Sequence, residues 1–179
     1  MGIINIANPA APVLVGLWRA PGFATDYELH VALIGDHAYL THGESGLRVI
    51  SITDPTRPME IGLYDTLDSA LSVAEQGGYV FAADERYGLR VIDVANPAVP
   101  VEVGFYDTPG RAYDVALAGS YAYVADYDRG LRVINVANPA APAEVGFYDT
   151  PGYAYGVALA GSYAYVRPVS MTRQDMPRA

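Results

Sequence analysis

The pentapeptide GLRVI stands at residues 46–50 and returns at residues 88–92 and 130–134, so that consecutive copies lie 42 residues apart. Extending the third copy in both directions gives a full unit at residues 110–151, GRAYDVALAGSYAYVADYDRGLRVINVANPAAPAEVGFYDTP. Four short apolar runs, separated by residues typical of turns, fill this unit. Four strands in a repeat of about 40–45 residues are typical of a β-propeller blade. The sequence therefore predicts an all-β protein, a β-propeller built from four-stranded antiparallel blades.

The four predicted strands of the unit, named A to D, cover residues 113–118, 121–125, 131–136 and 143–148. Gly119-Ser120 suits a two-residue type II′ turn between A and B, and the Pro-rich ANPAAP favours a turn between C and D. This hairpin places Ala116 opposite Tyr123 on one face and Val115 opposite Val124 on the other. Both faces are then apolar, so each blade needs a neighbour on either side.

The two ends of the chain supply incomplete units. The first residues are predicted as strands C and D, and residues 153–166 as strands A and B, before the pattern breaks at Arg167. Three complete blades and two halves predict four blades, one of them closed by strands from both termini, in a single domain of residues 1–166. We expect residues 167–179 to be a disordered tail. A closed ring predicts a monomer; otherwise the chain belongs to an oligomer or is a piece of a longer propeller.

The composition narrows the function classes. The net charge of −9 argues against binding nucleic acid, whose phosphates require a basic surface. All eleven basic residues are Arg, which excludes Schiff-base and P-loop lysine chemistry, and the lack of Cys excludes disulfides, thiolate nucleophiles and cysteine metal ligands. No apolar run reaches the length of a transmembrane segment and no secretion signal is recognised, so a soluble protein of unassigned compartment is expected.

The unit YDVALAGSYAYVADYDRGLRVINVANPAAPAEVGFYDTPG and its copies resemble the LVIVD repeat over about residues 3–166. This is a β-propeller repeat found mainly in bacterial and archaeal proteins, many of them at the cell surface. The resemblance implies a propeller scaffold with a cell-surface or secreted location. It implies no defined reaction and no catalytic residues.

The loops between strands B and C and between D and A share one end of a propeller. They are longer and more varied than the turns at the other end, which favours this end as the place for a ligand. The candidate binding residues are His30, His42, Asp84, Asp114, Asp126, Tyr113 and Tyr155. Stacking of the tyrosines on a sugar is a further hypothesis, set against the frequent occurrence of Tyr in β-sheet cores.

One Arg recurs at the same place in every complete strand C, and its copies are Arg48, Arg90 and Arg132. An Arg repeated within one chain is expected to form ion pairs that hold neighbouring blades together. The Asp of the repeated YDT is the expected partner, as Asp65, Asp107 and Asp149. These six residues are therefore predicted to be structural.

No G-x-S-x-G, H-E-x-x-H or phosphate-binding Gly-rich loop is present. We therefore expect a non-enzymatic scaffold, without cofactor or metal, that binds a protein or another macromolecule through the B–C/D–A end. The first alternative is a channel-centred metal-binding protein or hydrolytic enzyme that uses His30 and Asp114. A regular hairpin disfavours the metal site, because it pairs His30 with Thr41 and sends His42 to the opposite face. The second alternative is a truncated fragment of a larger LVIVD-repeat surface protein.

Overall fold

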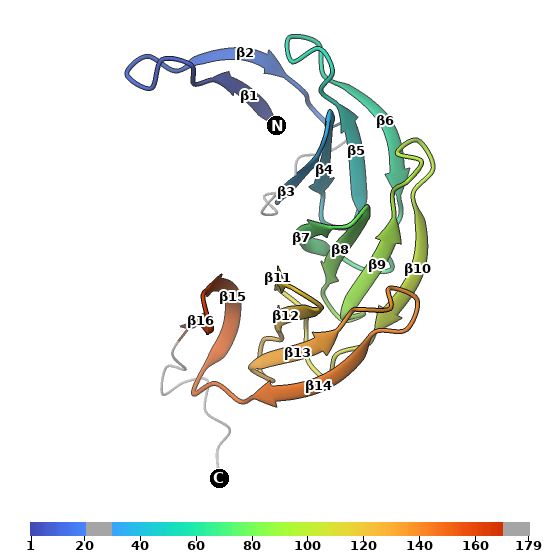
Figure 1. The fold of residues 1–179 in the computed structure, drawn as a ribbon, viewed down its shortest axis with the longest axis vertical. Helices are drawn as coiled ribbons and strands as arrows, with labels where there is room; N and C mark the ends of the chain where they lie inside the picture. The colour runs from blue at the N-terminus through green and yellow to red at the C-terminus, as the bar shows by residue number, and fades with distance from the viewer. Residues whose placement is uncertain (21–29, 170–179) are drawn as a thin grey trace.

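The computed structural model describes residues 1–20 and 30–169, and within these residues it contains sixteen strands and no helix. Three four-stranded antiparallel sheets lie side by side, with one two-stranded sheet at each end of the row. Figure 1 shows the five sheets arranged as an open arc, with β3, β7, β11 and β15 on its inner side. The all-β, bladed architecture predicted from the repeat is confirmed.

The elements are named from the N-terminus. The N-terminal half-blade is β1 (Gly2–Asn5) and β2 (Val13–Leu17). Blade 1 is β3 (Val31–Ile34), β4 (His37–Thr41), β5 (Leu47–Ser51) and β6 (Met59–Tyr64). Blade 2 is β7 (Ala70–Gln76), β8 (Tyr79–Asp84), β9 (Leu89–Asp93) and β10 (Val101–Tyr106). Blade 3 is β11 (Asp114–Ala118), β12 (Tyr121–Ala125), β13 (Leu131–Asn135) and β14 (Ala143–Tyr148). The C-terminal half-blade is β15 (Tyr153–Ala160) and β16 (Tyr163–Val169).

The predicted hairpin register of blade 3 is confirmed. Ala116 lies opposite Tyr123 and Val115 lies opposite Val124 along β11 and β12. Gly119 has a φ of +57°, the left-handed value that a type II′ turn requires at its first central position. Because a two-residue turn fixes the pairing of the strands that it joins, the sequence alone was sufficient to predict which side chains share a face.

The repeated GLRVI forms the start of strand C in each complete blade, and its apolar residues build the core. Leu47 and Leu89 are fully buried, as are Ile50, Ile92 and Ile134. The leading glycine has a φ of +71° to +73° in all three copies, a region that residues with a side chain rarely adopt. A Cβ at Gly88 would also overlap the backbone of Tyr106 and Thr108, where the chain leaves β10. Both the positive φ and the lack of space for a Cβ therefore require a glycine at the first position of GLRVI.

Apolar side chains fill the space between adjacent blades, as the two apolar faces of the hairpin predicted. Between blades 2 and 3, Phe81 and Val91 belong to the same buried cluster as Val124 and Ile134. A second cluster joins blade 1 to blade 2 in the same way. Burial between blades, rather than inside a sheet, thus supplies the core of this fold.

Close backbone packing fixes the outer edge of each junction. A Cβ at Gly62 would overlap the carbonyl oxygen of Pro97, and one at Gly104 would overlap that of Pro139. Each proline lies in the C–D turn of the following blade, which therefore presses directly against the D strand before it. Only a glycine permits this approach, which sets how neighbouring blades stack.

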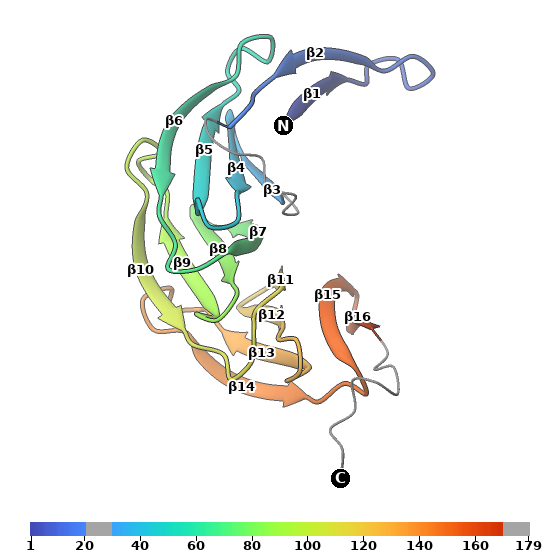
Figure 2. The same ribbon diagram turned by 180° about the vertical axis from the view of Figure 1, so that it is seen from behind.

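Within residues 1–20 and 30–169, the predicted closure of a fourth blade by strands from both termini is not present. The strands β1 and β2 form one sheet and β15 and β16 another, and these half-blades lie at the two ends of the arc (Figures 1 and 2). The rotation between neighbouring blades follows from their packing, and the successive rotations leave the ends of the arc apart. The strand β16 continues through Arg167 to Val169, past the predicted domain boundary at residue 166. The rest of the predicted tail, residues 170–179, lies outside the described residues, as do residues 21–29.

Candidate functional site

A cavity of about 570 Å³ opens on the inner side of the arc, between the inner strands of blades 2 and 3 and the C-terminal half-blade. Its lining residues are His30, Leu71, Tyr113, Asp114, Tyr155, Gly156, Val157, Ala158, Tyr165 and Arg167. His30, Tyr113 and Asp114 come from the beginnings of inner strands, just after the D–A loops. Four of the seven residues predicted as binding candidates therefore line one cavity, at the end of the blades where a ligand was expected.

One repeat position supplies a row of hydrogen-bonded side chains at this cavity. His30, Ser72, Asp114 and Gly156 are each 42 residues apart, and so they are equivalent positions in successive blades. Ser72 Oγ donates a 2.6 Å hydrogen bond to Asp114 Oδ1, and it lies 3.3 Å from His30 Nδ1. Asp114 Oδ2 accepts a 2.8 Å hydrogen bond from the backbone N–H of Val157. Three blades and the C-terminal half-blade are thereby linked across the inner surface.

The order of these three hydrogen-bonded side chains differs from that of a catalytic triad. In a triad the imidazole lies between the hydroxyl and the carboxylate, so that it can remove the hydroxyl proton. Here Ser72 lies in the middle, and its proton is directed to Asp114, which leaves the Nδ1–H of His30 as the donor to Ser72. The side chain of Ser72 is also buried, with 1% of the residue exposed. These hydrogen bonds hold His30 and Asp114 in place, and they do not activate Ser72 as a nucleophile.

Four tyrosines form an aromatic cluster beside the cavity. The rings of Tyr127 and Tyr153 stack in parallel with their centroids 4.3 Å apart, and Tyr155 meets Tyr113 edge-on at 4.9 Å. Burial raises the pKa of the Tyr113 phenol, so its ring presents a neutral surface at physiological pH. Rigid aromatic faces of this kind provide contact area at low cost in side-chain entropy.

Tyr127 reaches this cluster through an unusual backbone conformation. Its φ is +45°, and the equivalent Glu85 has a φ of +32°. Tyr127 exchanges two backbone hydrogen bonds with Ala154 at the start of β15, and the carbonyl of Glu85 accepts one from the N–H of Ala112, just before β11. Non-glycine residues in this region are strained and persist where the surroundings impose the conformation. The B–C loop is thus attached to the following blade beside the cavity.

Arg167 and Tyr165 line the cavity although neither was predicted as a site residue. Arg167 was interpreted as the point where the repeat ends. A usable signal existed, because the equivalent residues of the other blades are Thr41, Ala83 and Ala125, all of them small. A single large cation at a position otherwise occupied by small side chains distinguishes the C-terminal half-blade from the other three copies.

Asp84 and Asp126, two of the predicted binding candidates, lie away from the cavity and are fully buried. Asp84 accepts hydrogen bonds from the backbone N–H groups of Leu67 and Asp68, at 3.1 and 3.2 Å. Asp126 accepts a 2.6 Å bond from the Thr108 hydroxyl. Burial raises the pKa of both carboxyl groups. These residues anchor the incoming D–A segment, and no surface of theirs is accessible to a partner.

His42 occupies the position equivalent to Asp84 and Asp126 in the first blade. Its backbone N–H bonds to the carbonyl of Gly46, and its buried Nδ1 has no partner among the described residues. It does not line the cavity, whereas His30 does. The predicted backbone pairing of His30 with Thr41 is confirmed, with a 3.1 Å hydrogen bond from the Thr41 N–H to the His30 carbonyl.

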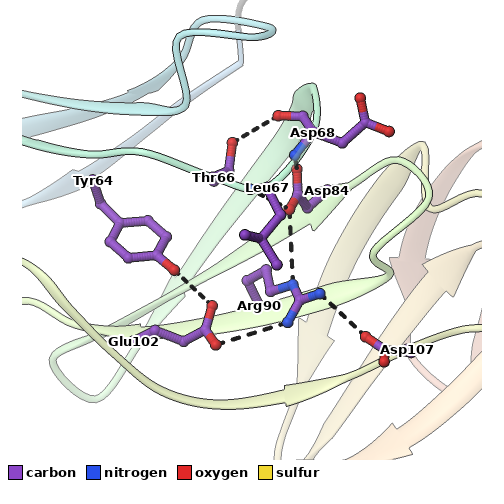
Figure 3. Close-up of polar contacts among 8 residues, drawn as sticks. All are labelled: Tyr64, Thr66, Leu67, Asp68, Asp84, Arg90, Glu102 and Asp107. Atoms are coloured by element: carbon purple, nitrogen blue, oxygen red, sulfur yellow. Dashed lines mark hydrogen bonds and ion pairs between the residues drawn. The ribbon is translucent and has the colours of Figure 1, made fainter.

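The repeated Arg is the centre of a charged junction in each blade. Figure 3 shows Arg90, only 3% exposed, directed toward Asp84, Glu102 and Asp107 at 3.7, 3.7 and 3.1 Å. Arg132 repeats this set with Asp126, Glu144 and Asp149. Arg48 forms its ion pair with Glu60 at 3.0 Å, and no contact between Arg48 and Asp65 appears among the described side chains. The predicted Asp partners are thus present in two of the three blades.

The contact between blades passes through residues that the prediction missed. The Tyr64 hydroxyl of blade 1 donates a 2.7 Å hydrogen bond to Glu102 of blade 2 (Figure 3), and Tyr106 donates to Glu144 in the same way. The ion pairs of each Arg lie within its own blade, so the prediction that these pairs hold neighbouring blades together is wrong. The Tyr–Glu bond instead joins blade 2 and blade 3 each to the blade before it. Both residues recur every 42 positions, which is the signal that would have identified them.

No group of three or more His, Asp or Glu side chains that could hold a metal ion occurs within residues 1–20 and 30–169. Over the same part of the chain, no helix is long and apolar enough to cross a membrane.

Comparison with known proteins supports the repeat and its fold. The family described as LVIVD repeat matches residues 28–66, 69–108, 109–150 and 151–167. No curated protein matches the chain. Among solved structures, the crystal structure of the computationally designed Ika8 protein is similar, with a TM-score of 0.61 at 7% identity over 77% of this chain. The match takes up 42% of the designed chain, and at this identity it supports the fold alone. Because the four matched segments span most of the sequence, the chain belongs to the LVIVD repeat family.

Proposed function

We propose that this LVIVD-repeat protein is a non-catalytic binding scaffold that holds a segment of a partner protein in the cavity on its inner surface. The observation that carries the proposal is the cavity itself, which combines three tyrosine rings with one carboxylate, one imidazole and one guanidinium. Its volume of about 570 Å³ lies within the range of specific ligand sites and is sufficient for one or two side chains. All of these groups stand on strands or at their ends, so the site is preorganised.

The charge of the molecule favours a basic partner segment. The chain has a net charge of −9, and the side chains of Asp107 and Asp149 at the D–A end are 60% and 72% exposed. Exposed carboxylates around a binding site attract a cationic partner and speed its association. We therefore expect binding to weaken as the salt concentration rises, because ions screen exposed charges.

The hydrolytic alternative receives no support from the geometry. Its best candidates, His30 and Asp114, are both bonded to the buried hydroxyl of Ser72, which lies between them. A general base needs direct access to the proton that it removes, and a nucleophile needs access to substrate. The same arrangement suits a binding site, because it fixes the positions of the imidazole and the carboxylate without assigning either to a reaction.

Selection of peptides from a random displayed library on the purified chain tests this function. We expect selected peptides to be rich in Arg or Lys with an aromatic or apolar anchor. Tyr155→Ala should weaken their binding, measured by calorimetry, by about tenfold or more, because it removes an aromatic wall of the cavity.

Tyr121→Ala is the matched control, since it removes an exposed tyrosine at the opposite end of blade 3. It should leave peptide affinity unchanged, and thermal melting of both variants confirms that each remains folded. Peptides that bind wild type and Tyr155→Ala equally well would place the binding surface elsewhere and reject the proposal.

A further inference from the structure

Among the described strands, the two half-blades have complementary edges with no strand paired to them. We propose that a second copy of this chain completes them. The half-blade β15–β16 has the inner strands A and B, and β1–β2 has the outer strands C and D. In the proposed assembly β1 of one copy pairs with β16 of the other, and the same junction forms again at the opposite end of the arc. Two arcs then make one closed ring with two-fold symmetry.

Gly146 is the first observation that points to a missing C–D turn. The equivalent Gly62 and Gly104 each have the next blade's C–D turn packed so closely that a Cβ would overlap it. At Gly146 a Cβ would meet nothing within 4 Å. The glycine is thus retained at a place where the described residues of this chain supply no neighbour. The Asn8-Pro9 turn of a second copy is the equivalent of the turns that pack on the other two glycines.

The N-terminal half-blade shows the matching exposed surface. Ile4 is equivalent to Ile50, Ile92 and Ile134, each fully buried against the preceding blade, yet Ile4 is 55% exposed. The same holds for Ile6, which is 70% exposed where Val94 and Val136 are buried. These side chains lie on the face that has no preceding blade. Burying such apolar surface is the dominant favourable contribution to association.

The last complete blade exposes the other half of this contact. Val145 and Tyr148 are 57% and 65% exposed, whereas the equivalent Val103 and Tyr106 pack against a buried cluster. On the C-terminal half-blade, Tyr165 is 60% exposed, and its equivalents Tyr39 and Phe81 are buried. The equivalent of each exposed residue packs against the next blade elsewhere in the same molecule.

The N-terminal half-blade already has the turn and the register shift that strands C and D have in a complete blade. Asn8 Oδ1 accepts a 3.1 Å hydrogen bond from the Ala10 N–H, and Asn138 forms the same turn with Ala140 at 3.2 Å. The register shift between Ile3 and Ile4 matches the one between Val133 and Ile134 in blade 3. A preformed turn and bulge lose little conformational entropy on binding.

The geometry favours a second copy over closure within one chain. The half-blades of one chain stand at the two ends of an open arc (Figures 1 and 2), while a two-fold axis brings each beside its complement in the partner. One copy also takes up 42% of the similar designed chain, which is close to half of a related fold. Two copies with net charges of −9 repel one another, so salt should strengthen the pair.

The repeat fixes the register of the new junction. In blade 1, His37 of strand B pairs with Ser51 of strand C. The equivalent pair in the proposed junction is Tyr163 of one copy with Asn5 of the other. Since the chain has no cysteine, the double variant Asn5→Cys/Tyr163→Cys introduces the only thiols. Oxidation should give a covalent dimer on a non-reducing gel, because directly paired strand residues lie within disulfide range. The variant Ile3→Cys/Tyr163→Cys, two residues out of register, should cross-link far less.

Light scattering of the full chain at physiological ionic strength should give twice the chain mass.

Gly146→Ala should leave the melting of the monomer unchanged and weaken the dimer by at least about tenfold, because the new Cβ would overlap the docked turn. Ile4→Asp should act in the same direction by placing a carboxylate in the contact. Val99→Asp, which changes a 61% exposed residue of an intact C–D turn, should have no effect on mass.

Three results would overturn the proposal. They are a monomer at all concentrations tested, a disulfide that joins Asn5→Cys to Tyr163→Cys within one chain, and a dimer that is unaffected by both Gly146→Ala and Ile4→Asp. None of these measurements depends on a bound ligand, so they stand apart from the peptide-binding test.

Discussion

Replacing Arg90 by Met should lower the free energy of unfolding by about 3–5 kcal/mol, the cost of breaking a buried ion pair by removing one partner. The Arg90 side chain contacts three carboxylates, and its guanidinium lies 4.9 Å from the centre of the Phe105 ring. Methionine restores much of the apolar contact but leaves the fully buried Asp84 without its cation. Thermal melting should record a fall in Tm of about 6–20 °C.

Two further variants separate the effect of leaving a buried carboxylate unpaired from the effect of losing an Arg side chain elsewhere. Arg111→Met breaks an exposed ion pair with Glu85 and should cost less than about 1 kcal/mol. The double variant Arg90→Met/Asp84→Asn removes the buried negative charge together with its partner, and so it should recover part of the lost stability. An Arg90→Met protein that melts within a degree of wild type would show that the buried ion pairs contribute little to the stability of the fold.

The glycine that opens GLRVI should be nearly as sensitive. Gly88→Ala adds two costs, about 1–2 kcal/mol for a side chain in the left-handed region and about 1–3 kcal/mol for overlap with packed backbone. The overlap involves Tyr106 and Thr108, which cannot move aside as a flexible side chain would. Chemical denaturation should therefore show a loss of about 2–5 kcal/mol.

Gly77→Ala is the matched control for this variant. Gly77 has a φ of +63°, but a Cβ there would meet nothing within 4 Å, so the substitution carries the conformational cost alone. It should destabilise by about 1–2 kcal/mol. Equal losses in Gly88→Ala and Gly77→Ala would mean that close packing against the chain leaving β10 contributes nothing.

The blades could be predicted from the sequence because local rules determine them. Two-residue turns set the register of each A–B hairpin, and apolar faces on both sides required blades to stack. The curvature of the arc could not be predicted, because it follows from backbone contacts such as that of Gly104 with the turn at Pro139, which no single repeat reveals. Closure was therefore expected within one chain, where the structure shows two separate half-blades.

The site was predicted in part, because some of the candidate binding residues line the cavity and others are buried parts of the scaffold. Asp84 and Asp126 were chosen for their polarity at the expected end, but recurrence at equivalent positions marked them as parts of the scaffold. His30 and Asp114 differ from each other at one repeat position and do line the cavity. His42 also differs from Asp84 and Asp126 at one repeat position and yet does not line the cavity, so variation at a repeat position is not by itself sufficient to identify a site.

A saturation scan that measures peptide binding and folding side by side tests the central claim, which is that the buried charged residues build the scaffold and the residues lining the cavity bind. It would cover Asp84, Arg90, Tyr113, Asp126, Arg132, Tyr155 and Arg167. We predict that substitutions at 113, 155 and 167 reduce binding in proteins that still fold, while those at 84, 90, 126 and 132 reduce folding first. Folded variants at 84 or 126 that specifically lose binding, with 113, 155 and 167 tolerant, would contradict the account.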